Sequence, residues 1–256
     1  MAGNEQVMTT VGPVSTSLAG IRLFMQTVLD AEPWIQEPWL NAIPWRRSTE
    51  GFSSSRPLRV AIMKDNGVVR PHPPVLRAID EVVENLRKDS SIEITEWTPL
   101  KHDYGQNLIV GDDRSYWCCN YLLTVLQRRL YFADGGQTQW DLLNQSGEPM
   151  MPLTRWIMQE QQPPLRKLDG MEVRALTKER DDYRAAYNKH WNATATGQNS
   201  TGNPTGAVDV ILSPTYPGAA PPLDHTKYWN YTSQWNLMDY PALVFPVSPR
   251  TFAKIR

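Results

Sequence analysis

The hydrophobic positions near the start of the chain repeat every three to four residues, which is the period of an amphipathic helix. Serine and threonine at 15–17 are residues that favour helix starts, so we expect a helix over about residues 16–30. The apolar positions that set this period are Leu18, Ile21, Met25, Val28 and Leu29. Residues 31–57 then hold three tryptophans and four prolines. This composition predicts an ordered connection, because flexible linkers are rich in small polar residues instead.

A strand, a helix and a second strand are predicted over the next forty or so residues. Leu58–Met63 is a short apolar strand, and Ile92–Trp97 alternates polar and apolar residues like a second one. Between them, Pro73 and Pro74 are typical of the first turn of a helix. Its apolar face is Val75, Ile79, Val82, Val83 and Leu86. Two strands joined by one helix form a βαβ unit, so we expect parallel pairing with helical cover.

The rest of the pattern extends this α/β fold. Helices are expected at 112–132, 138–145, 170–191 and 228–238, and two further strands at 208–212 and 242–247. Polar residues 193–206 are expected to form a loop without packing contacts. The four strands are apolar on both sides, which is typical of an inner sheet between helical layers.

The composition argues against two classes of partner. The chain has 26 basic and 27 acidic residues, a net charge of −1, so it lacks the basic surface that nucleic acid or an anionic membrane attracts. No apolar run approaches the roughly 20 residues of a membrane helix. The first residues also lack the basic and apolar blocks of a signal peptide. We expect a soluble, cytoplasmic protein that binds neither nucleic acid nor membrane, and the sequence predicts no oligomeric state.

Candidate catalytic and metal-binding groups are sparse. The only cysteines, Cys118 and Cys119, are adjacent, so they form no CxxC pair for zinc and are expected to be reduced thiols in a buried helix. There is no P-loop, GxSxG, HExxH or GxGxxG motif, so we predict no metal and no cofactor. Asp224 and His225 could join a serine in a triad only if the fold brought the three together. His102, beside Asp103, is expected in a solvated loop.

The segment YWNYTSQWNLMDYPALVFPV, residues 228–247, is rich in aromatic side chains, and two interpretations are open. The rings could simply fill the core, because one buried indole removes about 150–250 Å² from water. Alternatively, Trp229, Tyr231 and Trp235 bind a small organic substrate, since α/β sheets bind ligands beyond the ends of their strands.

The geometry of a helix narrows the second interpretation. Tyr231 and Trp235 are four residues apart and share a helical face, whereas Trp229 points elsewhere. We therefore expect Tyr231 and Trp235 to be the pair beside the cavity. Residues 226–230 are expected to be non-helical, with the helix beginning near Thr232–Ser233, where a hydroxyl can cap it.

Four blocks of the sequence resemble, in the same order, part of the fungal acetamidase-type amidases of the amidase-signature family. They are GPVSTSLAGIRLFMQTVLDAEPW (12–34), VAIMKDNGVVRPHPPVLRAIDEV (60–82), VDVILSPTYPGAAPP (208–222) and HTKYWNYTSQWNLMDYPALVFPV (225–247). The resemblance implies an α/β/α fold with a mixed central sheet covered by helices. It also implies hydrolysis of carboxylic amides to acid and ammonia.

The same resemblance implies where the catalytic groups belong. In that family a lysine, a bridging serine and a nucleophilic serine act together, and the serines lie in a Gly/Ser-rich segment that precedes the block at 12–34. The only Gly-Gly pair here, Gly135-Gly136, is followed by Gln137. We therefore expect no catalytic residue within residues 1–256. They would form one partial amidase-signature domain, a fragment without the N-terminal catalytic part and the extreme C-terminus. The alternative is a non-catalytic binding or regulatory protein with an aromatic small-molecule pocket.

Overall fold

The computed structural model describes residues 5–8, 10–45, 56–102, 128–161 and 164–247. The chain divides into two compact units, a smaller one of residues 9–57 and a larger one of residues 1–8 and 58–256. Residues 128–131 are helical, but the rest of the helix predicted at 112–132, with Cys118 and Cys119, lies outside the described residues. None of the helices in the described ranges is long and apolar enough to cross a membrane.

The smaller unit is built around one amphipathic helix, α1 (Leu18–Asp30). The Oγ of Ser17 accepts a hydrogen bond from the backbone N–H of Gly20 at 3.1 Å, which caps the first turn as the serine-rich start predicts. A short 3₁₀ turn, η1 (Pro33–Ile35), follows. No residue of α1 is buried, so this helix has no core of its own.

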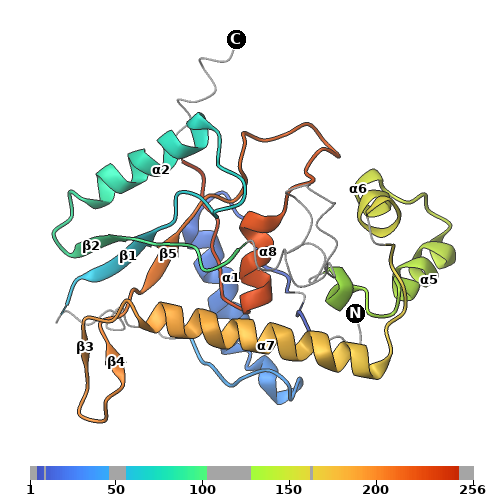
Figure 1. Ribbon diagram of the computed structural model, residues 1–256, viewed down its shortest axis with the longest axis horizontal. Coiled ribbons are helices and arrows are strands. Elements are labelled where there is room, and N and C mark those ends of the chain that lie inside the picture. Colours follow the sequence, from blue (N-terminus) through green and yellow to red (C-terminus); the bar gives the residue numbers. More distant parts are fainter. Residues whose placement is uncertain (1–4, 9, 46–55, 103–127, 162–163, 248–256) are drawn as a thin grey trace. The chain divides into compact units, whose positions relative to one another are not determined.

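The larger unit contains a three-stranded parallel sheet in the order β2-β1-β5 (Figure 1). Val60 in β1 is in register with Ile94 in β2 and with Val210 in β5. The elements are β1 (Leu58–Ile62), α2 (Pro73–Leu86), β2 (Ile92–Glu96) and β5 (Val210–Leu212). The predicted βαβ unit is confirmed, and Pro73 occupies the first turn of α2 as expected.

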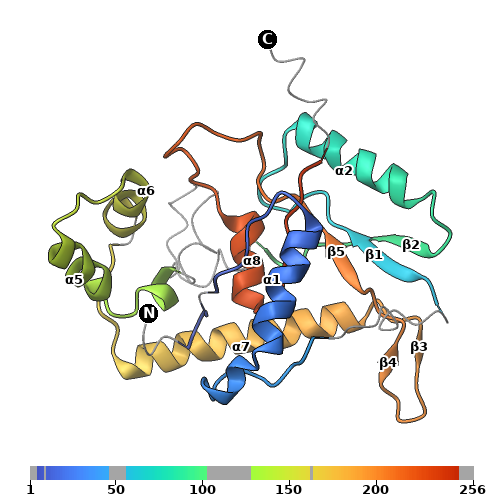
Figure 2. The same ribbon diagram turned by 180° about the vertical axis from the view of Figure 1, so that it is seen from behind.

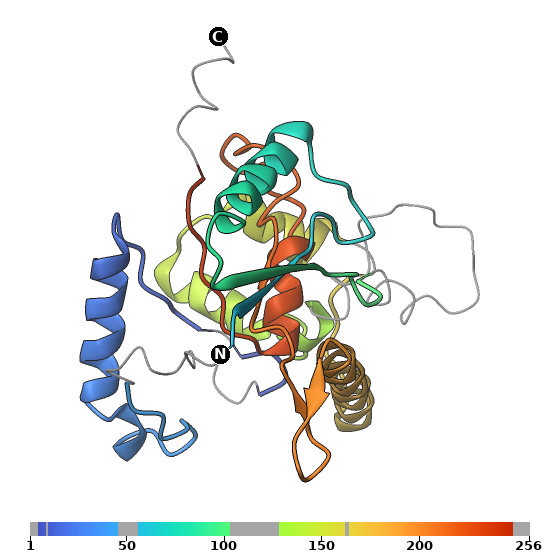
Figure 3. The same cartoon turned by 90° about the vertical axis from the view of Figure 1, so that its left-hand side faces the viewer.

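Helices cover both faces of this sheet. Successive side chains of β1 point to opposite faces, so each face contributes to a different core cluster. Val60 and Ile62 pack with Ile79 and Val83 of α2. Ala61 and Met63 belong to a second core cluster, to which α7 (Gly170–Asn192) and α8 (Asn230–Met238) contribute. Figure 3 shows α2 and α7 on opposite sides of the sheet. The α/β class inferred from the sequence is therefore confirmed.

The helix α7 has a strong start signal and a direct link to α8. Asp169 accepts hydrogen bonds from the N–H groups of Met171 and Glu172, each at 2.8 Å, and Glu172 accepts one from the Asp169 N–H; this is a complete capping box. Farther along α7, Tyr183 Oη accepts a hydrogen bond from Gln234 Nε2 of α8 at 3.0 Å, and Figure 2 shows one end of α8 above the middle of α7.

Three further helical segments and a hairpin complete the larger unit. They are α5 (Gln137–Ser146), α6 (Pro152–Arg155), the π-helical turn η3 (Trp156–Glu160) and the antiparallel pair β3 (Gly197–Gln198) and β4 (Pro204–Thr205). The helices predicted at 138–145 and 170–191 are confirmed. The predicted loop 193–206 contains this hairpin, each strand of which has two residues.

The fourth strand, predicted at 242–247, is wrong. These residues form no strand, and Leu243, Val244 and Phe245 are 58%, 64% and 47% exposed. A strand needs a partner for its backbone N–H and C=O groups, and none of the described strands pairs with this segment.

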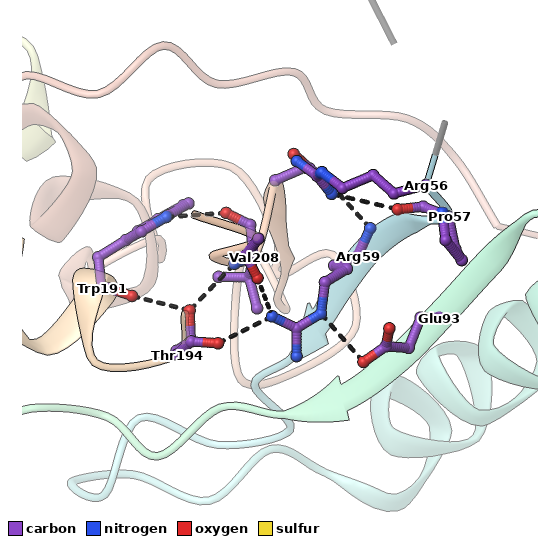
Figure 4. Close-up of polar contacts among 9 residues, drawn as sticks. Arg56, Pro57, Arg59, Glu93, Trp191, Thr194 and Val208 are labelled. Atoms are coloured by element: carbon purple, nitrogen blue, oxygen red, sulfur yellow. Dashed lines mark hydrogen bonds and ion pairs between the residues drawn. The ribbon is translucent and has the colours of Figure 1, made fainter. Parts of the chain in front are cut away.

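Arg59 joins β1 to the ends of α7 and β4 from inside the protein (Figure 4). Its Nε donates to Glu93 Oε1 at 3.0 Å, and its Nη1 donates to the carbonyl oxygens of Thr194, at 2.8 Å, and Gly206. The Thr194 hydroxyl accepts from the Val208 N–H at 3.0 Å. The side chain of Arg59 therefore holds three segments together.

His102 is buried, with 2% of its surface exposed, so the expectation of a solvated loop is wrong. Its ring stacks on Tyr187 and meets Trp235 edge-on, and Nε2 lies 3.1 Å from the Tyr187 hydroxyl. Burial, with a smaller contribution from the charge of His190, lowers the pKa of His102 to about 4. The ring of His102 is buried because it packs against aromatic side chains from distant segments. Its polar neighbours in the sequence give no sign of these contacts.

We expect His102 to make the protein less stable as the pH falls from about 6.5 to about 4. The unfolded state takes up a proton near pH 6.5, but the native state does so only near pH 4, so protonation favours unfolding in this window. The loss amounts to about 2 kcal/mol between pH 6.5 and pH 5. Urea unfolding of His102→Phe should show a shallower pH dependence than the unsubstituted protein. His225→Phe, at an exposed position, is the matched control, and an equal change in both variants would contradict this assignment.

Candidate functional site

A hollow of about 360 Å³ lies just past the carboxyl end of β5. The loop that leaves this strand supplies Thr215, Tyr216, Gly218, Ala220 and Pro221, and the segment that starts α8 supplies Thr226, Tyr228, Trp229 and Thr232. None of these lining residues is charged. The hollow therefore combines aromatic rings and small apolar groups with three threonine hydroxyls, at the edge of the sheet where α/β proteins bind ligands.

The proline-rich loop is fixed by contacts with the start of α2. The carbonyl of Pro217 accepts a hydrogen bond from the His72 N–H at 2.6 Å, and Pro217 itself is buried. Gly218 lies so close to His72 that an added Cβ would be 3.4 Å from its Nδ1. The loop wall is thus held in place by the βαβ unit.

Trp229 presents its indole to the hollow and is held from two sides. Its Nε1 donates to the Thr226 carbonyl at 2.7 Å, which is a contact within the same turn. Trp156 meets the ring edge-on, with 5.4 Å between ring centroids and an angle of 77° between the planes. Trp229 is therefore a fixed aromatic wall of the hollow.

Tyr228 and Tyr231 have their hydroxyl groups bonded within the protein. Tyr231 is 1% exposed; its hydroxyl donates to the Val69 carbonyl at 2.7 Å and accepts from the Asn66 N–H at 3.3 Å. The Tyr228 hydroxyl accepts from Asn66 Nδ2 at 3.0 Å. Burial raises the pKa of both tyrosines. These hydroxyls hold the turn after β1 against α8, and of the two rings only that of Tyr228 lines the hollow.

Trp235 lies in the second core cluster, edge-on to His102 and Tyr187. Of the three predicted substrate-binding residues, only Trp229 lines the hollow. Tyr231 and Trp235 do not line this hollow, and their pairing beside a substrate stays a prediction. The helix begins at Asn230 rather than at Thr232–Ser233, with no side-chain cap.

The threonines and Tyr216 were missed by the sequence reasoning. A signal for them exists in the sequence, because Thr215 and Tyr216 lie within three or four residues of the strand end at Leu212. In an α/β fold, polar residues in that position are candidates for ligand contacts.

A second hollow, of about 340 Å³, lies past the carboxyl end of β1 and has a charged lining. Within it, Lys64 Nζ and Asp80 Oδ1 form an ion pair at 2.6 Å, about half exposed on each side, and Arg70 and Asp65 complete the wall. Asp224 and His225 lie exposed in the loop before α8. Neither place has the uncharged lining of the hollow beside Trp229.

Comparison with known proteins identifies the family. The family model described as Amidase matches residues 1–254. The chain is 37% identical over 248 residues to an amidase-family protein of Schizosaccharomyces pombe, and 30% identical over 252 residues to the acetamidase of Aspergillus oryzae; each match covers 97% of this chain. A solved structure of fatty acid amide hydrolase aligns with a TM-score of 0.70 and 30% identity over 93% of this chain.

These matches cover only part of the relatives. The chain spans about 40% of the length of the two curated relatives and 36% of the fatty acid amide hydrolase chain. Within that part, the α/β fold agrees with the one that the sequence blocks imply. The chain belongs to the amidase family.

Proposed function

We propose that this chain supplies the substrate-binding wall of a hydrolase that splits carboxylic amides into acid and ammonia, with the hollow beside Trp229 as that wall. The observation that carries the proposal is the uncharged threonine and aromatic lining past the end of β5, in a chain of the amidase family. As a domain, residues 1–256 would be a partial amidase-signature domain. A cytoplasmic location is part of the proposal and is tested by fractionation.

The lining suits a neutral carboxamide. Such a ligand is planar, with N–H donors and one carbonyl acceptor. Within the described residues the hydroxyl groups of Thr215 and Thr226 form no hydrogen bond, so each could donate to the carbonyl or accept from the amide nitrogen. The carboxylate product is an anion and would meet no cation in this lining, so the neutral substrate is the better match.

The hydrolytic chemistry is assigned by resemblance to the intact relatives. In them a lysine deprotonates one serine through the other, and the acyl-enzyme on the nucleophilic serine is then hydrolysed. No residue of the hollow matches those roles, because its lining has neither lysine nor serine. We assign to Trp229, Thr215 and Thr226 the binding of the amide and no covalent step, and the proposed contributions of Tyr231 and Trp235 are indirect, through the packing of α8.

Trp229→Ala should weaken the binding of benzamide about tenfold. The substitution removes the aromatic wall, and an aromatic contact of this kind is worth about 1–1.5 kcal/mol, which corresponds to roughly a factor of ten in Kd. Titration followed by ligand-observed NMR measures this. Trp140→Ala, on α5 and not among the lining residues, is the matched control and should bind as the unsubstituted protein does. Equal affinities in all three proteins would exclude the hollow as the binding wall.

A further inference from the structure

Trp156 lies behind the wall of the hollow, in a π-helical turn. The segment Trp156–Glu160 winds as a π-helix directly after α6, and such turns are rare and often occur at functional sites. Trp156 is not among the lining residues, but its ring meets Trp229 edge-on. The turn therefore places one indole against the back of another.

This turn is anchored by a buried cation. Arg128 is 3% exposed, and its Nε donates to the Ile157 carbonyl at 2.6 Å. Its Nη2 lies 3.4 Å from the Gln161 carbonyl. The guanidinium of Arg128 thus bonds one carbonyl within the π-helical turn and one just after it, and it supports the segment that carries Trp156.

Trp156 has a second contact, with a residue far from it in the sequence. Lys227 Nζ lies 5.8 Å from the centroid of the Trp156 ring, within range of a cation–π interaction. Lys227 and Trp229 flank Tyr228 in the same segment, so both anchor that segment onto Trp156. Together with the hydrogen bond to Thr226, these contacts fix the plane of the Trp229 indole before any ligand enters.

We propose that Trp156 is a positioning residue that fixes the plane of Trp229 and so makes the hollow prefer flat aromatic amides over aliphatic amides of equal size. The inference rests on the proposed function, because it names the substrate class of that same hollow. A fixed indole face packs well against a planar ring. A puckered ring of the same carbon number touches the same face with fewer atoms, so it loses contact energy. If the indole could tilt, it would adapt to either ring and the preference would shrink.

The test compares benzamide with cyclohexanecarboxamide, which share the carboxamide group and the number of carbon atoms but differ in planarity. We expect the unsubstituted chain to bind benzamide at least tenfold more tightly. In Trp156→Ala the ratio of the two Kd values should fall to about two. Trp156→Phe should retain most of the preference, because a phenyl edge can still support Trp229. Trp140→Ala, which leaves this contact intact, should keep the full ratio.

The ratio distinguishes positioning from a loss of stability. A partly unfolded variant binds both amides more weakly by the same factor, so the ratio is insensitive to the folded fraction. If Trp156→Ala does not fold, Trp156→Leu removes the aromatic edge while keeping an apolar side chain, and the same fall is expected. If Trp156→Ala or Trp156→Leu binds both amides and the ratio of the two Kd values is unchanged, the inference is overturned, but the proposed function is not. An unsubstituted chain that binds neither amide would overturn the proposed function as well.

Discussion

Purified residues 1–256 should release no ammonia from acetamide or benzamide above the rate of the buffer. Removing the catalytic groups of a serine hydrolase typically lowers its rate by about 10⁴–10⁶. The hollow beside Trp229 has threonine hydroxyls, but no charged side chain lines it, so it contains no lysine that could deprotonate a hydroxyl. We therefore expect this chain to bind amides without hydrolysing them.

A coupled assay for ammonia measures this directly, with the acetamidase of Aspergillus oryzae as positive control in the same buffer. Thr215→Val, which removes a hydroxyl from the hollow, should leave the background rate unchanged. A turnover near one per second for the unsubstituted chain would contradict the assignment. It would mean that a nucleophile and a base lie within residues 1–256, and loss of that turnover in Thr215→Val would place the nucleophile in the hollow.

The βαβ unit could be predicted because several local signals agree there. Pro73 marks the first turn of α2, the apolar period is helical up to Leu86, and apolar runs lie on either side. Each signal acts over a few residues and none depends on distant partners. The capping box at Asp169, found in the structure, is a local signal of the same kind.

The segment 242–247 shows where a local pattern misleads. Its apolar residues have the composition of a buried strand, but strand formation depends on a neighbouring backbone that the pattern cannot reveal. In the described residues no such neighbour pairs with it, and its side chains are exposed. Apolar composition alone therefore predicted burial that this structure does not provide.

The site was only partly predictable, because long-range contacts determine which of its side chains are buried in the core and which line the hollow. Tyr231 is directed into the core by bonds to Asn66 and Val69, 165 and 162 residues away. Trp235 packs edge-on against His102 and Tyr187, which belong to distant segments of the chain. Helical spacing correctly placed Tyr231 and Trp235 away from Trp229. It could not show that Trp229 lines a hollow together with the proline-rich loop.

Arg59→Met should lower the free energy of unfolding by about 2–4 kcal/mol. Arg59 is 8% exposed, and its guanidinium satisfies the carbonyl oxygens of Thr194 and Gly206. Both carbonyls are partly buried, and losing a hydrogen bond from a charged donor at such a place is expected to cost about 1–2 kcal/mol each. Methionine keeps an apolar stem of similar length, so the loss reports the polar contacts. The ion pair with Glu93 adds little, because that carboxylate is 48% exposed and surface pairs contribute about 0–1 kcal/mol.

Arg56→Met is the matched control for this prediction, since it makes the same substitution three residues before Arg59 at an exposed position. Its Nη1 donates to the Pro57 carbonyl at 3.1 Å, and an exposed change of this kind should alter stability by no more than about 0.5 kcal/mol. Urea unfolding followed by circular dichroism gives both values. Glu93→Gln should resemble the control, because the two carbonyl contacts of Arg59 remain. Equal stabilities for Arg59→Met and Arg56→Met would show that the hairpin and the end of α7 stay in place without the guanidinium. In that case the packing of Trp191, whose Nε1 donates to the Val208 carbonyl at 2.8 Å, would be what joins α7 to the segment before β5.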